Sequence, residues 1–276
     1  MSDPRSRQAS RSATGESTDG ALSTPLALVD THCHLDLCEG DAASVVQRAR
    51  EAGVERIATV AIEPAGAGAA LELATAHPEV HAIVGCHPNS ASALDDAALA
   101  QLADSARHAR VVAIGETGLD YYRERAPRAT QVAAFRAQLE LARELQLPVV
   151  VHARAASDDT LRVLADHDSA TPVVLHCFGM PERVGECIER GYYCSFAGNV
   201  TYRNARDLQA AARQVPDELL LAETDAPFLS PQPLRGRPNE PANVAHTVAT
   251  LAALRGDDPA RLARQIADNA RRVFGW

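Results

Sequence analysis

Histidines and carboxylates that could bind a metal ion recur along this chain, and the first of them form a close pair. His32 and His34 lie two residues apart, shortly after the apolar residues Leu28 and Val29. Side chains alternate between the two faces of a strand, so Asp30, His32 and His34 would project from one face. Two imidazoles on one face at the end of a strand can bind one cation. A pair of surface histidines is the alternative, and this spacing alone does not decide between them.

Other candidate ligands lie where further apolar stretches end. They are His87, Glu116, His152, His176 and Asp225. The other five of the ten histidines fall in expected helices or before expected strands, where solvated or packing roles are the simpler interpretation. Imidazoles and carboxylates buried around one axis are costly without a cation or a dense hydrogen-bond network. We therefore predict a metal centre, with a polar core network as the alternative.

Without His87, six candidate ligands remain. Six are too many for one tetrahedral ion and suit two ions that share a carboxylate. Glu116 lies between the two groups of histidines in the sequence and is the expected bridge. Asp225 would orient a water molecule and accept its proton, so Asp225 and Glu116 are the predicted catalytic residues. Mixed nitrogen and oxygen ligands favour Zn²⁺ or Mn²⁺ over Mg²⁺, although open positions leave the ion undecided. The expected ligand sets are His32, His34, Glu116 and Asp225 for one ion, and Glu116, His152 and His176 for the other.

The elements that must position these residues follow a regular alternation. Expected strands are 27–31, 57–62, 81–86, 111–116, 149–152, 173–176, 192–196 and 219–223. Expected helices include 42–52, 94–108, 131–145, 160–167, 181–190, 205–214, 244–255 and 259–273. Strands that alternate with helices predict a parallel sheet, and this length favours a closed (β/α)₈ TIM barrel over an open doubly wound sheet. Active sites of such barrels lie at the C-terminal strand ends, where the candidate ligands fall.

Composition limits the classes of function. The net charge of −9 and the pI near 5.6 argue against a protein that coats duplex DNA, but not against one that binds a few phosphates. Six cysteines without a Cys-x-x-Cys motif are typical of a reducing, cytoplasmic setting. No apolar stretch is long enough to span a membrane. Residues 1–24 are polar and are expected to form a disordered leader before one barrel domain at 25–276.

Six short motifs occur in one order along the chain. They are Asp30–Asp36 (DTHCHLD), Gly115–Tyr121 (GETGLDY), His152–Arg154 (HAR), His176–Phe178 (HCF), Glu223–Pro227 (ETDAP) and Arg235–Pro241 (RGRPNEP). Together they resemble the TatD family of metal-dependent deoxyribonucleases, which are (β/α)₈ barrels of the amidohydrolase superfamily. The resemblance runs from about Leu26 to Trp276 and implies two divalent ions on the six residues named above. It also implies phosphodiester hydrolysis, usually 3′→5′ on DNA. Asn89 is a departure, because family members often have a second histidine there.

Three further residues are predicted to contact the substrate, namely His87, Arg154 and Arg235. Arg154 shares a strand face with His152 and could hold a phosphate, with a salt bridge at the barrel rim as the alternative. Arg235 lies in a Pro- and Gly-rich segment after the last strand, where it could contact a nucleic-acid strand or fasten the loop. The expected partner is DNA, single-stranded or at a 3′ end, bound with modest affinity and weak salt dependence.

Two other functions remain open from the sequence. The first is hydrolysis of an amide or ester, for example an aminoacyl ester on tRNA, as elsewhere in the amidohydrolase superfamily. The lactonase and phosphotriesterase branch is disfavoured, because its members typically bridge their metals with a carboxylated lysine on the fourth strand. Glu116 occupies that place here, and the chain contains no lysine. The second is a non-catalytic barrel, which predicts lost ligands, whereas all six positions retain one.

Overall fold

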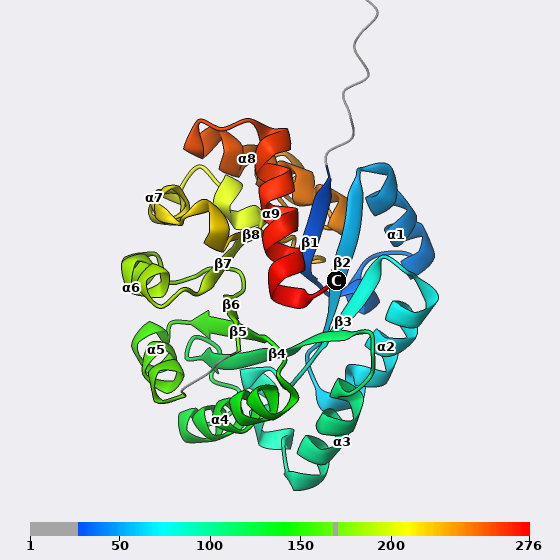
Figure 1. The fold of residues 1–276 in the computed structure, drawn as a ribbon, viewed down its shortest axis with the longest axis vertical. Coiled ribbons are helices and arrows are strands. Elements are labelled where there is room, and N and C mark those ends of the chain that lie inside the picture. The colour runs from blue at the N-terminus through cyan, green and yellow to red at the C-terminus, as the bar shows by residue number, and fades with distance from the viewer. Residues whose placement is uncertain (1–26, 168–170) are drawn as a thin grey trace, which may run out of the picture.

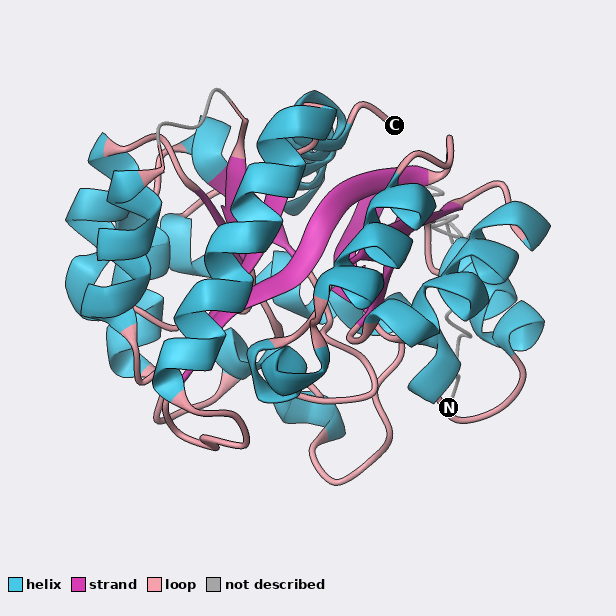
Figure 2. Cartoon of the chain, turned by 90° about the horizontal axis from the view of Figure 1, so that it is seen from below, coloured by secondary structure: helices cyan, strands magenta, loops and turns pink. Residues whose placement is uncertain are grey.

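The computed structural model describes residues 27–167 and 171–276, so the predicted leader at 1–24 lies outside the described residues. Eight parallel strands form one sheet in the sequence order β1 to β8. The sheet curls into a barrel with its helices on the outside (Figures 1 and 2). The prediction of a TIM barrel is confirmed.

Most elements lie close to their expected positions. The strands are β1 (Leu28–Cys33), β2 (Val54–Ala61), β3 (Val80–Val84), β4 (Val111–Asp120), β5 (Val149–Arg154), β6 (Val173–Leu175), β7 (Tyr193–Phe196) and β8 (Leu220–Ala222). The helices are α1 (Ala42–Glu51), α2 (Ala67–Ala76), α3 (Asp96–Ala106), α4 (Arg128–Leu145), α5 (Ser157–Asp166), α6 (Val184–Glu189), α7 (Arg206–Gln214), α8 (Val244–Arg255) and α9 (Pro259–Phe274). The largest difference is β4, which continues four residues beyond the expected end at Glu116.

Local sequence explains where these elements form. β3 and β4 are buried along their whole lengths, as parallel strands covered by helices must be. Helix α1 begins after Asp41, whose carboxylate accepts the backbone N–H of Ser44. Helix α9 begins after Asp258 with a proline in its first turn and ends at Gly275 in a left-handed conformation. All six cysteines are free thiols. No helix among the described residues is long and apolar enough to cross a membrane.

Backbone hydrogen bonds join the segment after the last strand to the first strand. The backbone N–H of Asp225, just after β8, donates to the carbonyl of His32 at 2.9 Å. The N–H of His34 donates in return to the carbonyl of Ala226 at 2.7 Å. Helix α9 packs against both β1 and β8. The segment after β8 is therefore fixed beside the histidine pair of β1.

A close approach of backbones brings β4 against β5. A Cβ atom on Gly115 would lie 2.7 Å from the carbonyl oxygen of Val150. A Cβ atom on Gly118 would meet the carbonyl oxygen of His152, and the φ of +130° at Gly118 disfavours other residues. Glycine at these positions therefore allows β4 to place Glu116 next to His152.

Candidate metal centre

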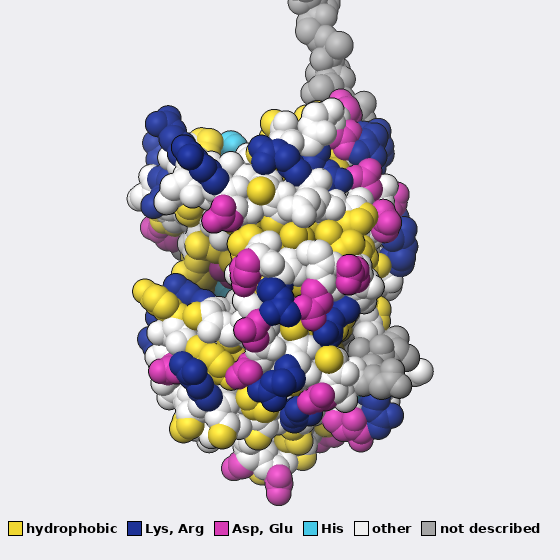
Figure 3. Space-filling model, turned by 90° about the vertical axis from the view of Figure 1, so that its left-hand side faces the viewer, with side chains coloured by type: hydrophobic (Ala, Val, Ile, Leu, Met, Phe, Trp, Pro, Cys, Tyr) yellow, Lys and Arg dark blue, Asp and Glu magenta, His cyan; other side chains and the backbone are white. Residues whose placement is uncertain are grey.

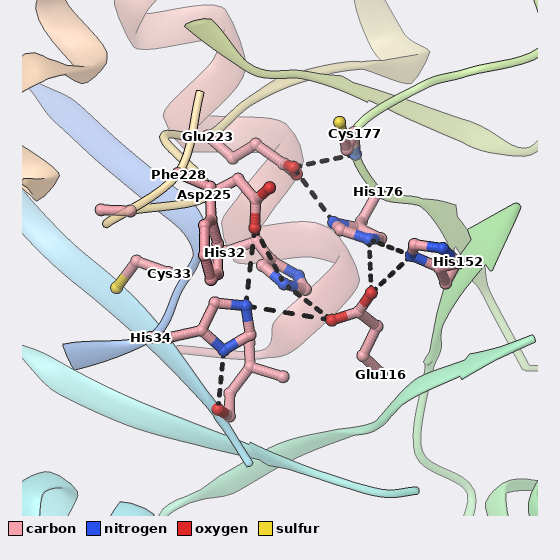
Figure 4. A network of polar contacts seen from close by, with 12 residues as sticks. His32, Cys33, His34, Glu116, His152, His176, Cys177, Glu223, Asp225 and Phe228 are labelled. Carbon is pink, nitrogen blue, oxygen red and sulfur yellow. Dashed lines mark hydrogen bonds and ion pairs between the residues drawn. The ribbon is translucent and has the colours of Figure 1, made fainter. Parts of the chain in front are cut away.

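The structure brings all six predicted ligands together at the C-terminal end of the barrel (Figure 4). They lie in β1, β4 and β5 or shortly after β6 and β8, so five different strands position them. Their nitrogen and oxygen atoms form overlapping groups in which all atoms lie within 4.8 Å of one another. These groups are His32–His34–Glu116, His32–His176–Asp225 and Glu116–His152–His176.

Glu116 lies at the middle of the cluster, and its two oxygens face different imidazoles. Oε1 lies 2.6 Å from Nδ1 of His152 and 2.8 Å from Nε2 of His176. Oε2 lies 3.4 Å from Nε2 of His32 and 4.0 Å from Nε2 of His34. A carboxylate that binds a different ion through each oxygen needs this division of its neighbours.

Asp225 completes the side of the cluster that contains the β1 histidines. Its Oδ1 lies 3.5 Å from Nε2 of His34 and 3.9 Å from Nε2 of His32. The backbone of Asp225 has a φ of +54°, which is uncommon outside glycine and is tolerated best by Asn and Asp. This conformation, together with the hydrogen bond to His32, aims the carboxylate at β1.

Unpaired nitrogen atoms in the cluster provide the test of whether a cation fits. His32 is fully buried, and within residues 27–167 and 171–276 neither of its ring nitrogens has a hydrogen-bond partner. Its ring stacks on that of His176, with centroids 3.9 Å apart and planes 15° apart. Burial first, and then the charge of His176, lower the pKa of His32 and favour the neutral form that binds metals. Since such orphaned buried nitrogens are costly, the residues present suit a bound cation.

Neighbouring imidazoles lower the pKa of both carboxylates of the cluster. Burial acts to raise the pKa of Glu116, but His176 and His87 hold that pKa well below its usual range. Burial likewise opposes ionisation of Asp225, and its hydrogen bond with His34 lowers its pKa overall. Despite burial, contacts with carboxylates raise the pKa of His34, His152 and His176. Divalent cations bound by these residues would release such protons.

Buried residues behind the cluster hold the ligands in place. Oε1 of Glu223 accepts the backbone N–H of Cys177 at 2.8 Å and lies 3.2 Å from Nδ1 of His176. Asp30 accepts the backbone N–H of Thr224 at 2.8 Å and the hydroxyl of Thr224 at 2.5 Å, which ties β1 to the segment after β8. Burial raises the pKa of Asp30 to about 8. Partners of this kind fix the orientation of metal-binding imidazoles.

The structure adds Asp120 to the cluster, a residue that the sequence analysis did not include among the candidate ligands. Asp120 is buried at the end of β4, and its Oδ2 lies 3.6 Å from Nε2 of His152 and accepts Nδ2 of Asn89 at 3.0 Å. His87 is nearby, with Nε2 3.5 Å from Oε1 of Glu116. Asp120 follows Glu116 by four residues on a continuous strand, so the period of two places both on one face. The spacing of four residues between Glu116 and Asp120 was the signal in the sequence that could have identified Asp120.

The two predicted substrate-binding arginines stack on tyrosines near the mouth of the barrel. The guanidinium of Arg154 lies 4.2 Å from the centroid of the Tyr122 ring. The guanidinium of Arg235 lies 4.2 Å from the centroid of the Tyr202 ring. Asn239, from the same Pro- and Gly-rich segment as Arg235, is instead buried and fastens the loop, with Nδ2 donating to the carbonyl of Phe228 at 2.6 Å.

Comparison with known proteins agrees with this geometry. A family model described as "TatD related DNase" matches residues 29–275. The chain belongs to the TatD family. A TatD relative from Mycobacterium tuberculosis, described as an uncharacterized metal-dependent hydrolase, is 40% identical over 258 residues, which cover 90% of this chain and 98% of the relative. A relative from Erwinia tasmaniensis, named as a 3′-5′ ssDNA/RNA exonuclease TatD, is 38% identical over 242 residues, which cover 85% and 93%.

A solved TatD structure has the same fold. The crystal structure of YjjV, a TatD homologue from Escherichia coli, superposes with a TM-score of 0.87 at 32% sequence identity. The match covers 92% of this chain and 100% of that structure. This TatD-family chain is therefore a metal-dependent hydrolase, with clustered histidines and carboxylates that could bind the metal.

Proposed function

We propose that this TatD-family hydrolase removes nucleotides from the 3′ end of single-stranded DNA and uses two divalent ions to do so. The observation that carries the proposal is the division of Glu116, whose two oxygens face separate groups of imidazoles. The name of the Erwinia relative and the description of the matching family support DNA as the substrate.

Each ion would have its own set of ligands around the shared carboxylate of Glu116. Divalent ions bound there would polarise a phosphoryl group and lower the pKa of a water molecule. Zn²⁺, Mn²⁺ and Mg²⁺ are the candidate ions, and the imidazole ligands favour the first two. The proposed sets are His32, His34, Glu116 and Asp225 for one ion, and Glu116, His152 and His176 for the other.

Asp225 is the residue best placed to accept a proton from water. Its side chain is 14% exposed, whereas that of Glu116 is 4% exposed, so Asp225 faces the open side of the cluster. Its lowered pKa keeps it ionised and able to act as a base. His87 and the cationic head of Arg154 would contact the phosphate, and Arg235 would contact the strand further out.

The experiment that tests the proposal uses single-stranded DNA labelled at its 5′ end. The protein is stripped of metal and then supplied with Zn²⁺, Mn²⁺ or Mg²⁺ in turn. We expect a ladder that shortens from the 3′ end and depends on the added metal. An aminoacyl-tRNA is tested beside it. Cleavage of the aminoacyl ester with every phosphodiester left intact would overturn the proposal.

A further inference from the structure

Phe228 is an aromatic residue at the edge of the metal centre. Its surface is 51% exposed, whereas the other four phenylalanines of the chain are buried. Its ring contacts that of His34 edge-on, with centroids 5.9 Å apart and planes 69° apart (Figure 4). An exposed apolar ring beside a polar site is left available to a ligand.

The backbone of Phe228 is fixed on both sides. Its N–H donates to the carbonyl of Asp225 at 2.8 Å, and its carbonyl accepts Nδ2 of Asn239 at 2.6 Å. Asn239 is buried and also donates to the carbonyl of Thr224 at 3.0 Å. The ring is therefore held on a braced segment next to the proposed ligand Asp225, which reduces the entropy that a stacking partner would have to offset.

Other aromatic residues lie at the same end of the barrel. Tyr122, in the segment after β4, is 69% exposed and carries the guanidinium of Arg154 over its ring. Tyr202, after β7, carries Arg235 in the same way. Figure 3 shows a notch in the left-hand outline of this face, with hydrophobic and basic side chains on its lower lip. Aromatic rings together with arginines are the features that bind single-stranded nucleic acid.

We infer that Phe228 is the platform on which the 3′-terminal base of a single-stranded nucleic acid stacks while its phosphate lies at the metal centre. The inference rests on the proposed nuclease function and adds the group that recognises the strand end. Any base can stack on phenylalanine, so the contact does not select a sequence. A paired terminal base must first leave its duplex, so the contact selects unpaired ends.

A double-mutant cycle between the protein ring and the DNA base tests this inference. Phe228→Ala and the wild type are compared on a short single-stranded DNA and on the same DNA with an abasic 3′-terminal nucleotide. We expect removal of the base to lower kcat/KM of the wild type roughly tenfold, as expected for loss of one stacking contact. The kcat/KM of Phe228→Ala should be almost the same on the two DNAs. If Phe228→Ala lowers kcat/KM by the same factor on both DNAs, the inference is overturned.

Two further variants separate stacking from packing. Phe228→Leu keeps an apolar side chain but lacks a ring, so it should lose the dependence on the base, whereas Phe228→Trp should keep it. Leu37→Ala is the matched control, because Leu37 is 47% exposed in the short helix η1 (Leu35–Leu37) and offers no ring. Its dependence on the base should equal that of the wild type. Loss of that dependence in Leu37→Ala, or its retention in Phe228→Leu, contradicts a stacking role.

A base-free diester distinguishes this inference from the proposed function. Each protein is also assayed on bis(p-nitrophenyl) phosphate, and its bound metal is measured. If the metal-loaded wild type cleaves neither this diester nor DNA, the proposed function fails. If the wild type cleaves both and the cycle shows no coupling, the stacking role of Phe228 alone fails.

Discussion

Among individual residues, Glu116 has the most unusual surroundings. Ring nitrogens of five histidines lie within 4.0 Å of its carboxylate oxygens. A buried carboxylate in an ordinary ion pair has one or two cationic partners, whereas this carboxylate is shared among residues from several strands. The bridging role proposed for Glu116 therefore requires its negative charge and both of its oxygens.

Replacing Glu116 by glutamine tests this sharing. Glu116→Gln keeps the size of the side chain but leaves one oxygen and no charge, so we expect bound metal to fall and kcat/KM on DNA to drop at least about 100-fold. Metal analysis and steady-state kinetics provide the measurements. Glu63→Gln is the matched control, since Glu63 contacts Ser90 outside the cluster. Full metal content and turnover in Glu116→Gln would exclude the bridging role.

Replacing Asp225 by asparagine tests the proton acceptor. Asparagine tolerates the positive φ at this position, so the fold should remain intact. We expect kcat to fall about 100-fold or more with a smaller change in KM, because general-base contributions are of that order. Steady-state kinetics on single-stranded DNA measure both parameters. An effect confined to KM would contradict the assignment.

At the scale of elements, strand β4 shows what the sequence can predict and what it cannot. The alternation of apolar stretches with helical patterns placed all eight strands, but it ended β4 at Glu116, four residues before the observed end at Asp120. The strand continues because Gly115 and Gly118 let its backbone lie directly against β5. That contact depends on tertiary packing, so the position of Asp120 beside His152 was not predicted.

The packing of β4 on β5 leads to a prediction about stability. Gly118→Ala would push a methyl group into the backbone of His152 at a φ of +130°. We expect the free energy of unfolding to fall by about 2–4 kcal/mol, from strain and overpacking together. Urea unfolding measures the change. Gly185→Ala in α6 is the control, because no atom lies within 4 Å of its added Cβ, and it should leave the stability unchanged or slightly higher. Equal effects of the two changes would show that the close approach is not needed.

At the scale of the whole molecule, the cluster combines candidate ligands spread over much of the chain, from His32 to Asp225. The meeting of these six residues was predictable because the barrel fold carries the C-terminal ends of its strands to one rim. The stacking of Arg154 on Tyr122 was not predictable, because it depends on how the segments after β4 and β5 lie relative to each other. The same holds for Arg235 on Tyr202, which joins segments after β7 and β8.

Metal removal should lower the thermal stability of the whole barrel. An ion that binds only the folded chain, at a free concentration of 100 times its Kd, raises the free energy of unfolding by about 2.7 kcal/mol. A change of 1 kcal/mol shifts Tm by about 2–4 °C for a chain of 150–250 residues. We therefore expect chelation to lower Tm by about 5–10 °C, as measured by calorimetry. For Glu116→Gln, the difference in Tm between the chelator-treated and the untreated protein should be much smaller. An unchanged Tm in the wild type would contradict metal binding at the cluster.

The junction between β8 and β1 has a consequence for the synthesis of the protein on the ribosome. His32 is synthesised early, yet its carbonyl accepts the N–H of Asp225, which is added almost two hundred residues later. A nascent chain that has not yet extended past Asp225 therefore lacks both this closing contact and one of the proposed ligands. The proposed nuclease would emerge inert and acquire its chemistry only as the final strand arrives.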